Sequence, residues 1–161
     1  MLRLIGIIIF TTCLCACGFH LRKVTPLPSQ FSSIYLQSKN PNEQFIQVLR
    51  RLLHANHAKV LNEKANAQAV IHILDIHQKQ VLNSLTGSAE AGLYSISTSV
   101  SFMATTQKGK ILLPKTTISA KRYFNSNATQ VLSAQSKSQQ LANEMRLQLA
   151  QELLNQINAS S

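Results

Sequence analysis

Hydrophobic residues in the first half of the chain recur with a helical period, directly after a cluster of helix-starting residues. Asn40 is a preferred N-cap, Pro41 suits the first helical position, and Glu43 stands where a capping box places an acid. Apolar residues then return every three or four positions, which places them on one side of a helix. They are Phe45, Val48, Leu49, Leu52 and Leu53. We therefore predict an amphipathic helix over residues 41–56.

Other segments alternate at every second residue, which is the period of a half-buried strand. The clearest is residues 93–104, where bulky side chains face one way and serines face the other. The two sets are Tyr94, Ile96, Thr98, Val100 and Phe102 on one face and Ser95, Ser97, Ser99 and Ser101 on the opposite face. Three more strands are predicted over residues 32–37, 69–78 and 116–124.

A helical period returns at the end of the chain. Ser136 and Gln139 offer a second capping box, and apolar residues follow at four-residue steps. These are Leu141, Met145, Leu149, Leu153 and Ile157. The predicted order of strand, helix, three strands and helix indicates an α+β fold. We expect a two-layer α/β sandwich, with two helices packed on one face of a four-stranded mixed sheet. The serine-lined face is then left for water or for a partner.

The N-terminal residues follow the pattern of a secretory signal peptide. Arg3 precedes an apolar run, and small residues lead to Cys17. The run from Leu4 to Phe10 is far shorter than the ~20 apolar residues that a bilayer core requires. The segment Leu14-Cys15-Ala16-Cys17 resembles the lipobox of bacterial lipoproteins. This resemblance implies cleavage before Cys17 and attachment of N-palmitoyl and S-diacylglycerol groups to it.

The chain then divides into three parts. We expect residues 1–16 to be a cleaved signal peptide, 17–31 a lipidated tether and 32–158 a single domain. Gly18 stands where enterobacterial lipoproteins retained in the inner membrane carry Asp, so the resemblance implies an outer-membrane protein that faces the periplasm. A zinc cluster of Cys13, Cys15 and Cys17 is disfavoured, because their alternate spacing lies in an apolar segment without clustered histidines.

Charge narrows the class of partner. The chain has 16 Lys and Arg against 6 Asp and Glu, a formal net charge of +10. Such an excess favours a polyanion or an anionic membrane. Export makes nucleic acid an unsuitable partner and leaves lipopolysaccharide, whose phosphates attract Lys and Arg. The alternative is a solvated basic surface that serves solubility alone.

The sequence gives no support for catalysis. The six acidic residues are scattered, and no pair forms an acid/base frame. His54 and His57 are interpreted as surface residues at a helix C-terminus, since no nearby carboxylate completes a metal site with them. No glycine-rich phosphate loop or nucleophile elbow is present. We therefore expect no enzyme, no metal and no cofactor other than the acyl chains on Cys17.

Two motifs resemble one known family. The mature start Cys17-Gly18-Phe19-His20-Leu21-Arg22 and the segment Ile118-Ser119-Ala120-Lys121, with Tyr123-Phe124, are similar to the lipopolysaccharide-assembly lipoprotein family LptE. The resemblance implies a two-helix, four-strand domain that plugs the outer-membrane β-barrel LptD as its heterodimer partner. It also implies roles in barrel assembly and in binding and delivering lipopolysaccharide to the outer leaflet, without enzymatic activity.

The resemblance does not transfer the family's ligand-binding residues directly. Those basic residues lie in loops, whereas residues 81–87 and 125–135 here contain no Lys or Arg. The remaining candidates for lipopolysaccharide binding are Lys115, Lys121, Arg122 and Lys137, and the alternative for each is a solvated surface charge. The competing functional hypothesis is a generic outer-membrane-anchored binding or scaffold lipoprotein in the periplasm.

Overall fold

The computed structural model describes residues 27–41, 43–85, 91–127 and 131–160. Their order confirms an α+β architecture in which helices and strands segregate into two layers. In chain order the elements are η1 (Ser29–Phe31), β1 (Ser33–Ser38), α2 (Gln44–Ala55), β2 (Lys59–Leu61), η2 (Lys64–Asn66), β3 (Ala69–Leu85), β4 (Ala91–Thr106), β5 (Ile111–Asn127) and α3 (Val131–Ala159).

The sheet is mixed, as expected, but it has five strands in the order β2-β1-β3-β4-β5, so the prediction of four was wrong. β1 pairs in parallel with β2 and β3, and β3, β4 and β5 form an antiparallel meander. The missed strand, β2, has three residues, too few to show an alternation. Main-chain pairing with β1 defines it, beginning where Ser33 lies opposite Lys59.

The meander is much longer than the sequence predicted. β3 continues to Leu85 instead of Gln78, and β5 covers residues 111–127 instead of 116–124. On the side of β3 that faces the helices, Gln78 and Gln80 interrupt the apolar alternation between Ile76 and Leu82. Those residues are bonded to α3: Ser138 Oγ donates a 2.8 Å hydrogen bond to Gln80 Oε1. Residues 81–85, predicted as a loop, therefore belong to β3.

Both helices begin at different residues from those expected. α2 starts at Gln44, and the Asn40 carbonyl accepts a hydrogen bond from the Glu43 amide in the turn before it. Asn40 is thus not the N-cap, and Glu43 makes no side-chain capping bond. α3 starts at Val131, so the expected capping box at Ser136 lies inside the helix. No proline or glycine interrupts residues 131–136, and nothing local prevents the helix from starting early.

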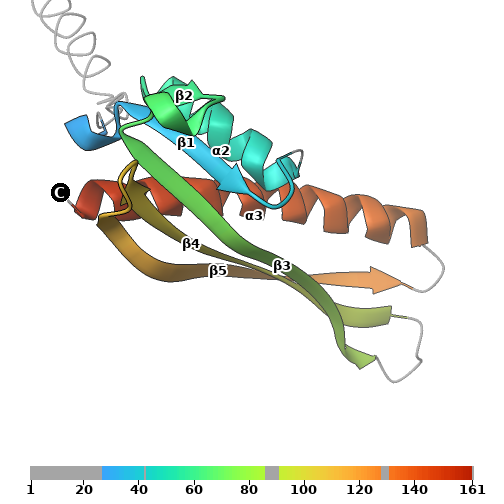
Figure 1. Cartoon of the computed structure of the whole chain (residues 1–161). Helices are drawn as coiled ribbons and strands as arrows, with labels where there is room; N and C mark the ends of the chain where they lie inside the picture. Colours follow the sequence, from blue (N-terminus) through green and yellow to red (C-terminus); the bar gives the residue numbers. More distant parts are fainter. Residues whose placement is uncertain (1–26, 42, 86–90, 128–130, 161) are drawn as a thin grey trace, which may run out of the picture.

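The two helices cover one face of the sheet, as predicted (Figure 1). The apolar stripe expected on α3 is fully confirmed: Leu141, Met145, Leu149, Leu153 and Ile157 are all buried. It packs against the apolar face of β4, whose Ile96, Val100 and Phe102 have no exposed surface. The meander extends past β1 and α2, and there Tyr94 stacks on Phe124 with ring centroids 5.5 Å apart.

A leucine on α3 gives a test of this packing. Leu149 is 1% exposed within the core, whereas Leu132 on the same helix is 81% exposed. We expect Leu149→Ala to lower the free energy of unfolding by about 2–5 kcal/mol through lost burial and a residual cavity. Leu132→Ala should change it by less than about 0.5 kcal/mol. Urea denaturation followed by circular dichroism measures both, and equal effects would contradict the proposed core.

Candidate functional site

The face of the sheet that the helices leave open is polar along β4. Ser97 and Ser99 alternate with buried core residues and are half-buried between the flanking strands. Cross-strand bonds satisfy part of this face: Ser101 Oγ lies 2.8 Å from Thr117 Oγ1, and Ser97 Oγ donates to the Lys79 carbonyl at 3.4 Å. The alternation read from the sequence is therefore confirmed, with serines on the open side.

Two lysines meet on this open face. The register places Lys79 of β3 and Lys121 of β5 opposite Ser97 from either side. Because neighbouring strands lie ~4.8 Å apart, the two backbones are ~10 Å apart and both side chains leave the same face. Both lysines are exposed. Two cations at this separation form a site at which an anionic group is attracted from both sides.

Apolar side chains adjoin the two lysines. Val81 and Tyr123 both pair with Ser95, two residues farther along the same face, and are 38% and 58% exposed. The Lys121 Nζ lies 5.0 Å from the centre of the Tyr123 ring, a cation–π contact. We call Lys79, Val81, Lys121 and Tyr123 the amphiphilic patch. It combines positive charge with exposed apolar surface.

The structure separates the four basic residues that the sequence analysis selected. Lys121 belongs to the amphiphilic patch, but Arg122 points to the opposite face, where its Nη2 donates a 2.6 Å bond to Gln148 Oε1 of α3. Consecutive residues of a strand face opposite sides, so these two cannot share one site. Lys115 lies ~20 Å along β5 from Lys121, where the register shifts between Phe102 and Ala104. Lys137 is exposed on α3.

Lys79 was missed by sequence reasoning. It lies just past the predicted end of its strand, in a stretch where polar residues hide the strand period. The alternation of His77, Lys79 and Val81 against Ile76, Gln78 and Gln80 was the available signal. The lipidation candidate Cys17 and residues 17–26 of the expected tether 17–31 lie outside the described residues.

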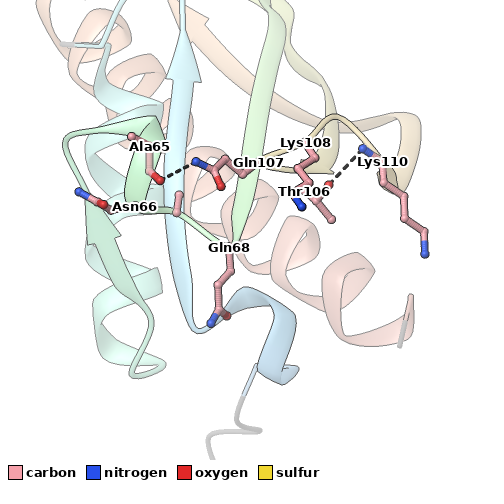
Figure 2. Close-up of a pocket in the computed structure, with 8 residues that line it drawn as sticks. Ala65, Asn66, Gln68, Thr106, Gln107, Lys108 and Lys110 are labelled. Carbon is pink, nitrogen blue, oxygen red and sulfur yellow. Dashed lines mark hydrogen bonds between the residues drawn. The ribbon is translucent and has the colours of Figure 1, made fainter.

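A second feature lies at the opposite end of the sheet, beside the point where the chain enters the fold. An open pocket of about 550 Å³ lies between η2 and the turn that joins β4 to β5. It is lined by Ala65, Asn66, Ala67, Gln68, Thr106, Gln107, Lys108 and Lys110. Figure 2 shows the Gln107 side chain reaching across to donate to the Ala65 carbonyl, which ties the turn to η2.

Close to this pocket, the imidazole of His72 contacts a threonine of the neighbouring strand β4. Its Nε2 lies 3.0 Å from Thr105 Oγ1. Partial burial lowers the pKa of His72, and the positive charge of Lys64 lowers it further. Seven residues separate Lys64 from His72 in the chain, and the charge of Lys64 nevertheless acts on the imidazole of His72.

Among residues 27–41, 43–85, 91–127 and 131–160, His, Cys, Asp and Glu nowhere gather in threes in a way that suits a metal ion. In the same residues, no helix has the length and apolar character to cross a membrane.

Comparison with known proteins gives a consistent result. The family model "LptE: Lipopolysaccharide-assembly" matches residues 31–157. The LPS-assembly lipoprotein LptE of Photorhabdus laumondii is 22% identical over 154 residues, which cover 96% of this chain and 82% of that protein.

Two solved structures share the fold. Lipoprotein B of Nitrosomonas europaea has a TM-score of 0.72 at 23% identity, with 88% of this chain and 91% of that chain covered. A minor lipoprotein of Acinetobacter baumannii has a TM-score of 0.67 at 21% identity, with 83% and 94% covered.

The effect of Lys64 on His72 is directly testable. Because the pKa of His72 is lower in the folded protein than in the unfolded chain, the unfolded chain binds a proton at His72 at a higher pH than the folded protein does. The stability given by neutral His72 is therefore present above its ordinary pKa of 6.5 and is lost as the pH falls below it. We expect Lys64→Gln to raise the pKa of His72 only part of the way to its ordinary value, because burial, the larger cause of the shift, remains.

An NMR titration of the His72 imidazole measures this pKa. Lys137→Gln, at the far end, should leave the pKa unchanged, and an unchanged pKa in Lys64→Gln would refute the assignment.

Proposed function

Because this chain belongs to the LptE family of lipopolysaccharide-assembly proteins, we propose that it binds lipopolysaccharide and serves its delivery to the outer leaflet as the plug of the β-barrel LptD. The family is non-enzymatic and uses no cofactor. The protein's work is then binding and positioning rather than chemistry.

The amphiphilic patch is the observation that carries the ligand proposal. Lipopolysaccharide presents phosphates beside sugars and acyl chains, and the patch presents two lysines beside Val81 and Tyr123. A phosphate between Lys79 and Lys121 is attracted by both ammonium groups, while the exposed apolar surface accepts the less polar part of the ligand. Lys115, Arg122 and Lys137 stand apart from the patch and would add only longer-range attraction.

The open serine face supports the partner proposal. A β-barrel large enough to hold a plug has a polar interior. The hydroxyls of β4 and the exposed polar residues of β3 and β5 offer hydrogen-bonding groups to such a lining. An apolar sheet face could not form hydrogen bonds with the polar interior of the barrel. We therefore assign this face to contact with the barrel, and the amphiphilic patch to the part of it that meets ligand.

The anchor proposal rests on Cys17. Acylation there, with N-palmitoyl and S-diacylglycerol groups, would hold the protein at the outer membrane on its periplasmic side. More than one acyl chain is needed for stable anchoring, because each buried methylene contributes only about 0.8 kcal/mol. The curated relative from Photorhabdus laumondii is itself named a lipoprotein.

Charge reversal tests the ligand proposal. We expect Lys79→Glu/Lys121→Glu to weaken binding of purified lipopolysaccharide by at least about tenfold, since each lysine near an anionic surface contributes ~1 kcal/mol. The measurement is titration of labelled lipopolysaccharide into the purified protein. The matched control is Lys39→Glu/Lys115→Glu, which makes the same change of net charge at exposed lysines outside the patch and should lose much less affinity. Equal binding by both variants would refute the patch.

Co-purification tests the partner proposal. We expect the protein, extracted from outer membranes in mild detergent, to be recovered with a large β-barrel in about equal amounts. Mass spectrometry identifies the barrel. Recovery of the free lipoprotein without a barrel would contradict the plug and would favour the generic scaffold hypothesis.

A further inference from the structure

Four exposed lysines gather at the end of the sheet that lies farthest from the amphiphilic patch. Lys59 begins β2, Lys64 begins η2, and Lys108 and Lys110 lie in the turn between β4 and β5. They share one end because β1, β2, β3 and β5 all begin there and β4 ends there. We call these four residues the cationic end. In the described part of the chain, none of them forms an ion pair.

The pocket at this end has the groups that a phosphate ester requires. Lys108 and Lys110 supply charge, Asn66 and Gln68 supply side-chain amides, and Ala65 and Ala67 add small apolar surface. Figure 2 shows that η2 and the turn between β4 and β5 carry these residues on neighbouring segments, with the side chains of Asn66, Gln68 and Lys110 extending outward in different directions. The volume of about 550 Å³ accommodates a lipid headgroup.

The turn that carries two of these lysines is fixed by its backbone. Gly109 has a φ of +89°, a conformation that favours glycine, and lies between Lys108 and Lys110. The Gly109 amide donates to the Thr106 carbonyl, and the Lys110 amide donates to Thr106 Oγ1 at 3.1 Å. The lysines therefore project from an ordered turn.

The length of the preceding chain and its point of entry show which end of the fold lies closer to an acyl group on Cys17. The described fold begins at Leu27, and about ten residues at ~3.6 Å each separate it from Cys17, a reach of at most ~36 Å. Along β3, Lys79 of the amphiphilic patch lies ten residues from Ala69, ~33 Å at ~3.3 Å per residue. An acyl group on Cys17 thus lies nearest the cationic end, and it reaches the level of the amphiphilic patch only when the tether is almost fully extended.

We propose that the cationic end is a second binding site, which docks on the phosphate headgroups of anionic glycerophospholipids in the leaflet that holds the acyl chains. The proposal rests on the proposed acylation of Cys17 and is independent of lipopolysaccharide binding by the patch. Docking fixes the orientation of the domain: the cationic end lies at the headgroups of that leaflet, and the meander leads from there to the amphiphilic patch. The acyl chains attach the protein to the membrane, and the lysines orient the domain on it.

Hydrogen exchange on the reconstituted protein tests this docking. Full-length acylated protein is purified from membranes, its acylation is verified by intact mass, and it is placed in phosphatidylcholine vesicles with or without roughly a third of phosphatidylglycerol. We expect amides of residues 106–110 to exchange about fivefold more slowly in the anionic vesicles, the gain that one lysine at an anionic surface gives. High salt should remove the difference by screening.

Matched variants separate this site from the patch. Lys108→Glu/Lys110→Glu should abolish the difference between the two vesicles, and Lys79→Glu/Lys121→Glu should retain it. Equal exchange of the unmodified protein in both vesicles would overturn the proposal. The same protection from inorganic phosphate in phosphatidylcholine vesicles would also overturn it, because it would show a free-anion site. The proposal that the amphiphilic patch binds lipopolysaccharide is tested separately. It fails if Lys79→Glu/Lys121→Glu binds titrated lipopolysaccharide as well as the unmodified protein does.

Discussion

Burial of one side of α3 along β4 and β5 is the interaction on which the rest of the structure depends. Met145, Leu149 and Leu153 remove the apolar face of the meander from water, and Ile96 and Phe102 are inaccessible beneath them. A meander of long strands would otherwise expose apolar surface on one side. Successive residues of a strand face opposite sides of the sheet. Because the apolar residues of β4 pack against α3, its serines lie on the open face.

In this strongly basic chain, most of the charged side chains remain at the surface of the fold. Ionised side chains stay at the surface because burying them without partners is costly, and few acids are present to neutralise them. The strand register then determines which basic side chains lie on the same face of the sheet. Lys79 and Lys121 meet across β4, whereas Arg122, next in sequence to Lys121, is directed to α3.

The elongated fold separates two charged regions with different surroundings. In the half of the meander that lies away from the entry point, lysines adjoin exposed apolar side chains, a combination suited to an amphiphilic ligand. At the end where the chain enters, lysines surround an open polar pocket beside the tether. Length is the property that keeps them distinct: strands of 17 residues hold the two regions far apart on one rigid sheet.

The sequence determined the features that depend on local periodicity: the two helices on one face, the alternation of β4, the apolar stripe of α3 and the motifs of the family. Residues such as Leu149 and Ser97 report their environment through spacing alone. Tertiary structure decided the rest. β2 is defined by pairing with β1, and β3 reaches Leu85 because α3 and β4 satisfy its polar residues. Lys79 joins Lys121 only through a register between strands that are distant in sequence. Periodicity is a property of neighbours along the chain, whereas a binding site is made by neighbours across the sheet, and no local pattern specifies that register.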